Sequence, residues 1–536
     1  MEMIRKLLVL LIICLGITVC MNPADAAEQQ YKKISRDGIS DIVDGKYDET
    51  IKSFTEYLNE NPGDLESMYV LAVAYAQKND IAKSMEYVKQ AVDSGLPFAR
   101  FIAGPRALLK PLTDSTAFQA YAGKIDSLFV HGPTVGCVTH DSARFWIRTA
   151  QEADFLVKLS KSSNLGNSII SQKVRTKKDN DYTAIAMVDG LDPETEYFYS
   201  IYINDQKQDG QWSFKTFPKT DEHYRFQVGF GGGAGYTPKY EYMWNTIHSH
   251  NPLAFLLLGD NVYIDNPTRP DVQRYCYYRR QSREEFRKFA ASTSVFSIWD
   301  DHDFTVNDAW GGPEINDPEW KIPVWRLYKN NWNNPAYGGG EAQPGCWYDF
   351  SIGDVDFFML DGRYYRTDPK IDNPLMLGPV QMQWLLKALK QSTGTFKVIA
   401  SPVPWSYGAK PGSLDPWQGY TAEREQIFSF LEENSIEGVV LISADRHRSD
   451  AWKIERENGY TLYEFESSKI SNIHTHGIMP GSMFGYNDTC SFGLLTFDTM
   501  SSDPTVAYEI YNIDNHLIHK ITLKKSQLTH KKRGNK

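Results

Sequence analysis

The sequence is poor in cysteine, has no excess of positive charge and has no long hydrophobic run beyond its N-terminus. Lysine and arginine number 57 against 67 acidic residues, which gives a net charge of −10. Proteins that bind nucleic acid mainly through its phosphates need a basic face, so this balance argues against nucleic acid as a regulatory partner. Past the N-terminus no stretch reaches the roughly 18 apolar residues of a transmembrane helix, so we expect no membrane span.

The N-terminus is typical of an exported protein. A basic start precedes an apolar run over residues 7–20, and a small-residue cleavage site follows at residues 24–26. We therefore predict a signal peptide over residues 1–26 and a location in the periplasm or outside the cell. Lipoprotein anchoring at Cys20 is less favoured, because Val19 is bulkier than such a cleavage site prefers.

Cysteines and basic clusters are both sparse. Four cysteines follow the predicted signal peptide: Cys137, Cys276, Cys346 and Cys490. In an oxidising compartment they allow one or two disulfides, whose pairing the sequence does not give. The basic tail, residues 525–536, is interpreted as a solvated end and not as a binding arm.

A chain of 536 residues exceeds what one hydrophobic core usually supports, so we expect two to four domains. The first covers residues 31–125, where apolar residues recur every three or four positions, as in packed helices. Residues 45–62 and 65–92 follow the spacing of tetratricopeptide (TPR) repeats. Two repeats at most cannot bury a solenoid core alone. We therefore expect this α-helical repeat domain to dock on its neighbour as a structural cap, with binding of a protein partner as the alternative.

Residues 130–218 change to an alternating pattern. The segments ARFWIRTA, DFLVKLS and YTAIAMV are rich in β-branched and aromatic residues with turns between them, which indicates strands. The segment GLDPETEYFYSIYI resembles a corner of a fibronectin-type sandwich, where a buried tyrosine ties a turn to the sheet. We predict a fibronectin-like β-sandwich that serves as a scaffold.

Residues 223–524 alternate short apolar strands with helical stretches, which is typical of an α/β domain. In such sheets chemistry collects at the carboxyl ends of the strands. The segments whose ends carry polar or metal-binding residues are YRFQVGFGG, LAFLLLGD, VFSIWDDHD, VDFFMLDGR, FKVIASPVPW and GVVLISADRH.

Carboxylates, a phenol and imidazoles follow three of these strands. Asp300 and Asp301 are adjacent, and such like charges cost folding energy unless cations or arginines offset them. Asp445 and His447 lie two residues apart, on one side of an extended chain, where they can chelate one ion. The competing interpretation is that these residues start ordinary turns. The predicted metal ligands are Asp260, Tyr263, Asp300, Asp301, Asp445 and His447.

Arginines and glycines offer contacts to phosphate. Arg363 and Arg366 lie in the segment LDGRYYR, and a planar guanidinium suits phosphate oxygens. A salt bridge to a neighbouring acid is the alternative for each. The glycine-rich loop over residues 231–236 lets backbone N–H groups, such as that of Gly233, approach a phosphate.

Together these segments resemble the metallophosphoesterases, and more narrowly the PhoD-type alkaline phosphatase family. The resemblance covers roughly residues 131–524 and rests on the order and spacing of GDNVYID, WDDHDF, LDGRYYR, LGPVQMQWL and SADRH. It implies a β-sandwich followed by an α/β metallophosphoesterase sandwich. The expected multidomain fold is therefore a TPR-like helical repeat, a fibronectin-like sandwich and the α/β catalytic domain.

The resemblance also implies roles for individual residues. Asp260 would bridge two metal ions, and His302 would be a further ligand or the proton donor to the leaving group. Arg279 enters through the segment YYRRQSREEFRKF, which looks like an Arg/Tyr-rich helix of the family. The residues expected to hold the substrate phosphate are Arg279, Asn307, Gly233, Arg363 and Arg366.

One departure concerns the metal. The family usually has a cysteine ligand soon after the first catalytic strand, whereas residues 231–236 here contain no Cys, Asp or His. The identity and number of the metals therefore stay open. The pair His474 and His476, downstream of SADRH, is a candidate replacement set of ligands.

The predicted function is that of an exported phosphoesterase, an alkaline phosphatase or phosphodiesterase. It would release phosphate from small phosphate esters by attack of a metal-bound hydroxide. An oxygen-rich ligand set for two or more divalent or trivalent ions favours Ca²⁺, Mn²⁺ or Fe over Zn²⁺. A larger or more hydrophobic substrate is possible if Tyr364, Tyr365, Trp405 and Trp417 line the pocket and are not core. A further alternative is a non-catalytic phosphate- or partner-binding protein with a degenerate active site.

Overall fold

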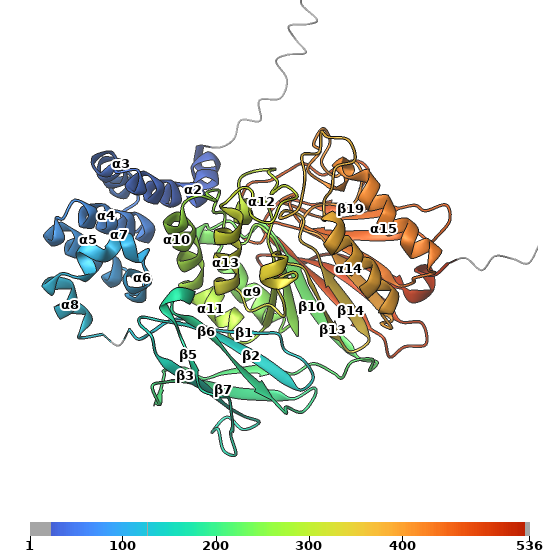
Figure 1. The fold of residues 1–536 in the computed structure, drawn as a ribbon, viewed down its shortest axis with the longest axis horizontal. Helices are drawn as coiled ribbons and strands as arrows, with labels where there is room; N and C mark the ends of the chain where they lie inside the picture. The colour runs from blue at the N-terminus through green and yellow to red at the C-terminus, as the bar shows by residue number, and fades with distance from the viewer. Residues whose placement is uncertain (1–22, 126, 531–536) are drawn as a thin grey trace, which may run out of the picture.

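The structure, a computed structural model, describes residues 23–125 and 127–530. A helical part, a β-sandwich and a larger α/β part follow one another along the chain (Figure 1). The predicted signal peptide falls mainly on residues 1–22, and the end of the predicted basic tail on residues 531–536, both outside the described residues. Within the described ranges no helix is at once long enough and apolar enough to cross a membrane.

The helical part is built around α4 (Leu65–Gln77), which is buried on nearly every side. Asp64 caps this helix by accepting a hydrogen bond from the Ser67 backbone N–H at 2.7 Å. Asp80 caps the next helix through the backbone N–H of Lys83 at 3.0 Å. The other helices are α2 (Pro23–Val43), α3 (Tyr47–Glu60), α5 (Ile81–Asp93), α6 (Ala99–Ala103), α7 (Arg106–Thr113) and α8 (Thr116–Ala122).

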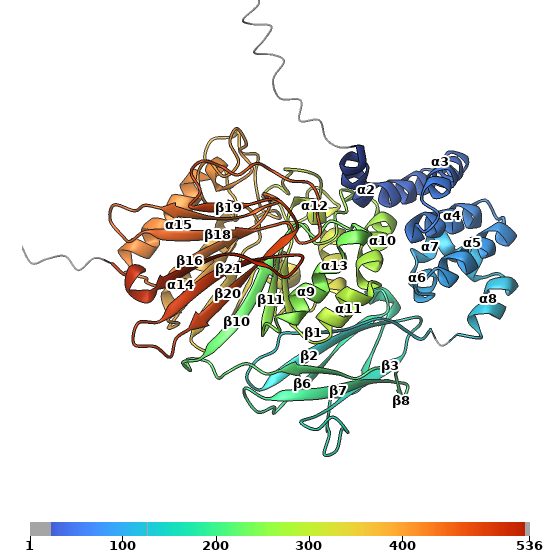
Figure 2. The ribbon, with the colours of Figure 1, turned by 180° about the vertical axis from the view of Figure 1, so that it is seen from behind.

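The helical part docks on the α/β part through α2. This helix lies beside α10 (Pro270–Gln281) in both views (Figures 1 and 2). The Arg279 side chain donates to Ser35 Oγ at 2.7 Å, and Arg269 pairs with Asp44 at 2.7 Å. The expected docking on a neighbour is confirmed, whereas the TPR class of these helices stays a prediction.

Antiparallel sheets form the β-sandwich. Its strands are β1 (Phe129–Gly136), β2 (Ser142–Thr149), β3 (Asp154–Ser160), β4 (Ile169–Ile170), β5 (Val174–Arg175), β6 (Thr183–Asp189), β7 (Glu196–Ile203), β8 (Gln206–Lys207) and β9 (Trp212–Lys215). One sheet has the order β1-β2-β6 and the other β4-β3-β7-β8, with β5 on β3 and β9 on β7. The buried Tyr197 accepts a hydrogen bond from the Asp192 N–H at 2.9 Å, so the expected tie between tyrosine and turn is present. The fibronectin-like class of the sandwich stays a prediction.

Two sheets pack face to face in the α/β part (Figure 2). The first contains β10 (Arg225–Gly231), β11 (Ala254–Leu258), β12 (Ser294–Ile298), β20 (Ser491–Asp498), β21 (Thr505–Asn512) and β22 (Leu517–Lys524). Its order is β12-β11-β10-β20-β21-β22, with β10, β11 and β12 parallel. Tyr508 of this sheet packs against Phe465 of the second sheet with ring centroids 4.6 Å apart.

The second sheet and the helices complete the layers. This sheet contains β13 (Tyr348–Ile352), β14 (Val355–Met359), β15 (Phe396–Ala400), β16 (Val439–Ser443), β17 (Ser449–Ile454), β18 (Leu462–Ser467) and β19 (Phe484–Tyr486). Its order is β13-β14-β15-β16-β18-β17-β19, with β14, β15, β16 and β18 parallel. The covering helices are α9 (Met243–Ser249), α11 (Glu284–Ala290), α13 (Lys321–Asn331), α14 (Gly378–Gln391) and α15 (Thr421–Glu433).

The carboxyl ends of the central parallel strands meet at one edge of the α/β part. Asp260 follows β11, Asp300 follows β12 and Asp445 follows β16. Asp300 also caps α12 (Asp301–Phe304), a short helix at this edge. The prediction that strand ends bring polar residues together is confirmed.

The structure decides two questions that the sequence left open. The four cysteines of the described residues are all buried free thiols, so the possible disulfides do not form. They lie in separate segments of the chain, and three of them contact backbone carbonyls: Cys137 faces Asn333 at 3.1 Å, Cys490 faces Asn472 at 3.8 Å and Cys276 faces Tyr263 at 3.9 Å. The aromatic residues weighed for a hydrophobic substrate are buried in the core: Tyr364, Tyr365, Trp405 and Trp417.

Candidate metal centre

Strained backbone concentrates at the strand-end edge. Gly259 has φ +107°, and a Cβ there would lie 2.5 Å from the Asp300 Cβ, so glycine lets two loops meet. Left-handed backbone at non-glycine residues costs of order 1–3 kcal/mol each and is typical of functional sites. The predicted metal ligands with φ between +48° and +76° are Asp260, Tyr263, Asp445 and His447, and the neighbouring Asp265 and Asp308 share this conformation.

Asp260 is the centre of a buried polar cluster. The Tyr263 hydroxyl donates to Asp260 Oδ2 at 2.8 Å and lies 3.0 Å from His447 Nε2. His447 Nε2 is 3.8 Å from the same Asp260 oxygen. Asn472, which sequence reasoning missed, donates through Nδ2 to the Tyr263 hydroxyl at 2.6 Å. Three predicted metal ligands therefore come together, although 184 residues separate Tyr263 from His447.

A second group of predicted residues lies beside this cluster. Asp260, Asp301 and His302 each offer a ligand atom within 4.8 Å of the others. Asp301 is oriented by the backbone N–H of Asp308 at 2.6 Å. Asp303 instead accepts from the backbone of the Asp260 loop, so it is a structural tie between the two loops.

The predicted phosphate clamps Arg363 and Arg366 are at most 1% exposed and lie in internal ion pairs. Arg363 binds Asp300 at 2.5 Å, and both arginines bind Asp415, at 2.8 and 2.9 Å. Both arginines therefore form the salt bridges that were the alternative to binding phosphate. Asp415 was not identified from the sequence because it follows no strand and belongs to no motif.

Asp445 is balanced by a lysine that the sequence did not single out. Lys410 Nζ lies 3.2 Å from Asp445, 3.1 Å from Asp415 and 2.9 Å from Asp308. Arg446 adds a weaker pair with Asp445 at 3.5 Å. Asp445 therefore faces cations of the protein in this structure.

The remaining predicted substrate contacts have different surroundings. Arg279 is 1% exposed and lies over the Tyr236 ring at 4.4 Å, and it is not among the residues that line the pocket described below. The Gly233 N–H donates to the Gly259 carbonyl at 3.2 Å, so the group expected to bind phosphate already has a partner. Asn307 is exposed and lines the pocket.

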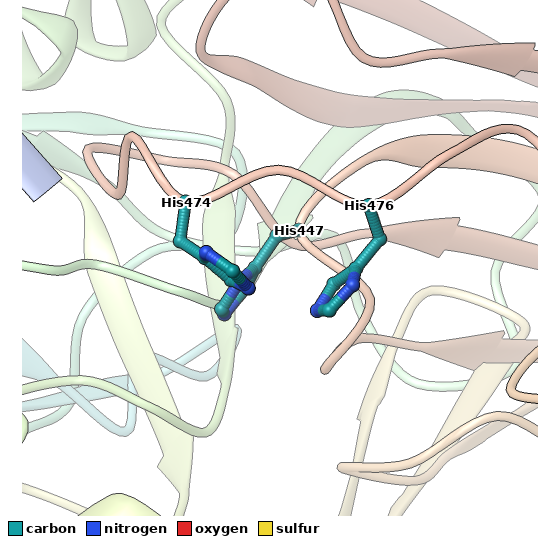
Figure 3. A group of neighbouring side chains, drawn as sticks. All are labelled: His447, His474 and His476. Atoms are coloured by element: carbon teal, nitrogen blue, oxygen red, sulfur yellow. The ribbon is translucent and has the colours of Figure 1, made fainter. Parts of the chain in front are cut away.

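A pocket of about 470 Å³ opens over these groups. Beyond predicted residues it contains Lys33, Asp308, Lys410 and Arg446, and the candidate pair His474 and His476 also lines it. His447, His474 and His476 form a second group whose ligand atoms lie within 4.8 Å of one another (Figure 3). The residues that line the pocket are Lys33, His302, Asn307, Asp308, Lys410, Asp445, Arg446, His447, His474 and His476.

The N-terminal helix α2 forms part of this site. Arg36 donates to the Tyr263 carbonyl at 3.2 Å and forms an ion pair with Asp265. Asp265 in turn hydrogen-bonds His302 Nδ1, and Lys33 lines the pocket. No local sequence pattern predicts this contact, since 227 residues separate Arg36 from Tyr263.

Burial sets the electrostatics of the cluster. It raises the pKa of both Asp260 and Asp300 well above the ordinary value. Burial alone would lower the pKa of His302, but Asp301, Asp260 and then Asp265 outweigh it and raise that pKa to about 10.

The donor set fits a bound cation. Among the described residues, Asp260 Oδ1 and Asp300 Oδ2 are buried and have no hydrogen-bond partner. A buried carboxylate oxygen without a partner costs free energy, and a cation beside both acids would remove that cost. The phenol of Tyr263 and the imidazole of His447 extend the same set of donors.

Comparisons with known proteins identify the relatives of this chain. The PhoD-like phosphatase model matches residues 228–488, and the model of the N-terminal domain of PhoD-like phosphatases matches residues 115–218. Alkaline phosphatase D of Bacillus subtilis (strain 168) is 33% identical over 255 residues, which are 42% of this chain and 42% of that protein.

Solved structures show the same fold. A structure of PhoD aligns with a TM-score of 0.60 at 18% identity, covering 75% of this chain and 92% of the other. A purple acid phosphatase from yellow lupin (Lupinus luteus) seeds aligns with a TM-score of 0.55 at 13% identity, covering 74% and 75%. Because the two family models match the sandwich and the α/β part in that order, the chain belongs to the PhoD-like phosphatase family.

Proposed function

We propose that this protein is a metal-dependent phosphoesterase that hydrolyses small phosphate esters. The observation that carries the proposal is the pair of buried acids, Asp260 and Asp300, each with a carboxylate oxygen that lacks a partner among the described residues. Tyr263 and His447 complete the donor set beside them. The similarity to alkaline phosphatase D supports the same reaction class.

Asp260, Tyr263, Asp300, Asp301 and His447 would hold the metal ions. Carboxylate and phenol oxygens suit Mn²⁺, Fe or Ca²⁺. When bound, such cations supply charge compensation for phosphoryl oxygens and lower the pKa of a coordinated water. Asp445 is the predicted ligand with the least support, because Lys410 and Arg446 already face its carboxylate.

The chain's own residues would position the ester. Asn307, Lys410 and Arg446 line the pocket and offer donors to phosphate oxygens. His302 reaches the same pocket with Nδ1 held by Asp265, so its other ring nitrogen can deliver a proton to the leaving oxygen. Arg363 and Arg366 act as positioning residues, since they hold Asp300 and Asp415 in place.

Pocket size and lining favour a compact, polar ester. The pocket measures about 470 Å³ and its lining is polar, whereas the aromatic side chains considered for a hydrophobic substrate are buried elsewhere.

We also propose export, on the N-terminal pattern of residues 1–26. N-terminal sequencing of the mature protein from its native host would test this, with a start near residue 27 as the expected result.

The function is tested with p-nitrophenyl phosphate and bis-p-nitrophenyl phosphate at alkaline pH. Protein stripped by chelator is refilled separately with Ca²⁺, Mn²⁺, Fe or Zn²⁺. We expect turnover restored by metal, lost in Asp260→Ala and kept in Asp205→Ala, an exposed carboxylate of the sandwich. Folded wild-type protein without turnover under any metal would support the non-catalytic binding protein instead.

A further inference from the structure

A loop after β18 places two imidazoles opposite His447. His474 and His476 lie two residues apart in a segment without helix or strand, and both side chains project to one side of the chain (Figure 3). Their ring centroids are 5.2 and 5.4 Å from that of His447, and 4.7 Å from each other (Figure 3). One ring nitrogen from each residue lies within 4.8 Å of the others. We call His447, His474 and His476 the histidine trio.

Hydrogen bonds fix the loop in this conformation. The hydroxyl of Thr475, between the two histidines, donates to the Asn487 carbonyl at 3.1 Å and accepts from Lys469 Nζ at 2.7 Å. Asn487 Nδ2 donates to the His476 carbonyl at 2.9 Å. The loop is thus tied on both sides of Thr475, and the imidazoles need no rearrangement to converge.

The start of the loop is tied to the carboxylate cluster. Asn472 Oδ1 accepts from the His474 N–H at 3.1 Å, and Asn472 Nδ2 lies 3.1 Å from His447 Nε2. A single side chain therefore sets the position of the loop relative to the third imidazole. Such outer contacts are what orient the ligands of protein metal sites.

The glycine loop leaves room for this arrangement. A Cβ at Gly233 would lie 2.3 Å from the Ser468 carbonyl oxygen and 3.4 Å from His447 Cδ2. A cysteine there would displace the backbone that leads into the loop of His474 and His476. The residue at this position and the added imidazoles are therefore sterically linked features of this chain.

Positive side chains of the protein lie around the trio. Lys33, Lys410 and Arg446 line the pocket, and the last two pair with Asp445, at 3.2 and 3.5 Å. Lys410 is paired with Asp308 as well, at 2.9 Å. These ion pairs weaken the repulsion that Lys410 and Arg446 would exert on a metal ion held by the neutral imidazoles.

We propose that the histidine trio binds a divalent transition-metal ion, as a nitrogen site that adjoins the carboxylate cluster and shares His447 with it. Imidazole donors suit Zn²⁺, Co²⁺, Ni²⁺ or Cu²⁺, whereas Ca²⁺ and Mg²⁺ prefer oxygen. Three histidines leave a further position, and the pocket provides access to it. The proposal does not rest on the hydrolytic activity.

The test uses the untagged full-length protein, stripped by chelator and titrated with Co²⁺. Tetrahedral nitrogen coordination gives visible absorption that weakly bound cobalt lacks. We expect wild-type protein to bind one equivalent more than His474→Ala/His476→Ala, and the visible absorption to disappear in that variant. Asp260→Asn should keep the absorption, since it leaves the trio intact, and His140→Ala is the control for an exposed histidine elsewhere.

A second measurement covers variants that alter the loop. Electron paramagnetic resonance of bound Cu²⁺ reports how many imidazole nitrogens coordinate the ion, and His474→Gln and His476→Gln should each remove one. Equal cobalt binding and absorption in the double variant and wild type would overturn the proposal. An equal loss in His140→Ala would overturn it as well.

Discussion

Replacing Asp260 by asparagine separates the cost of the buried carboxylate from its use in metal binding. Asp260 is 2% exposed, and burial followed by the nearby Asp301 and Asp303 charges raises its pKa, against an opposing effect of His302. Without a cation, a buried charge that lacks partners costs at least the roughly 1–3 kcal/mol of an unsatisfied buried polar group. Asparagine removes the charge, keeps the shape and can still accept from Tyr263, so metal-free Asp260→Asn should exceed the wild type in free energy of unfolding by about 1–3 kcal/mol.

Bound metal should make the wild type more stable than Asp260→Asn. A ligand that binds only the folded state stabilises it by about 2.7 kcal/mol at 100 times its dissociation constant. The free energy of unfolding of the wild type should rise by about this amount with Mn²⁺, and that of Asp260→Asn should rise little. Without metal, the advantage of the variant should shrink as the pH falls below the raised pKa of Asp260, and it should be gone below about pH 4, where the acid is protonated in folded and unfolded wild type alike.

Urea unfolding followed by tryptophan fluorescence, with EDTA and with Mn²⁺, measures these differences. Asp303→Asn is the matched control. Its two oxygens accept from the backbone N–H groups of Asn261 and Val262 at 3.0 and 2.9 Å, so an amide there loses an acceptor and should lower stability. A metal-free Asp260→Asn protein less stable than wild type would refute the reasoning, because the carboxylate would then have a favourable partner in the fold.

Three further predictions concern stability. Burial lowers the pKa of Lys321 to about 8, so the folded state loses this proton before the unfolded chain does. The free energy of unfolding should therefore rise between pH 8 and 10 by up to about 1.4 kcal/mol per pH unit relative to Lys321→Met, as followed by urea titrations at each pH. A Cβ at Gly38 would lie 2.4 Å from the Phe54 ring, so Gly38→Ala should destabilise the helical part by about 1–3 kcal/mol in thermal unfolding. The four buried thiols should resist Ellman's reagent until the protein unfolds, and a reductant should leave the melting temperature unchanged.

Much of the fold follows from local sequence. Segments with alternating apolar and polar residues form the sandwich strands, and apolar runs that end in Asp form the parallel strands whose ends meet at one edge. These features follow from side-chain periodicity and from the direction of parallel strands, both of which a short segment contains. For the same reason Asp260, Tyr263 and His447 were found as neighbours in a site before their contacts were known.

Pairings between distant segments could not be derived in this way. Arg363 was expected at the phosphate, but the fold supplies Asp415 as its partner, from a loop with no motif. The sequence gives the type of each side chain. Whether that side chain contacts a ligand or forms an ion pair depends on which loop packs beside it.

The sequence by itself determined the family, the order of the parts and the residue types at the strand ends. Only the tertiary structure decided that α2 brings Arg36 to the Tyr263 loop, and that His474 and His476 converge on His447. Periodicity and motifs act over a few residues, while these contacts join segments that the packing of sheets and helices brings together, so no local pattern encodes them.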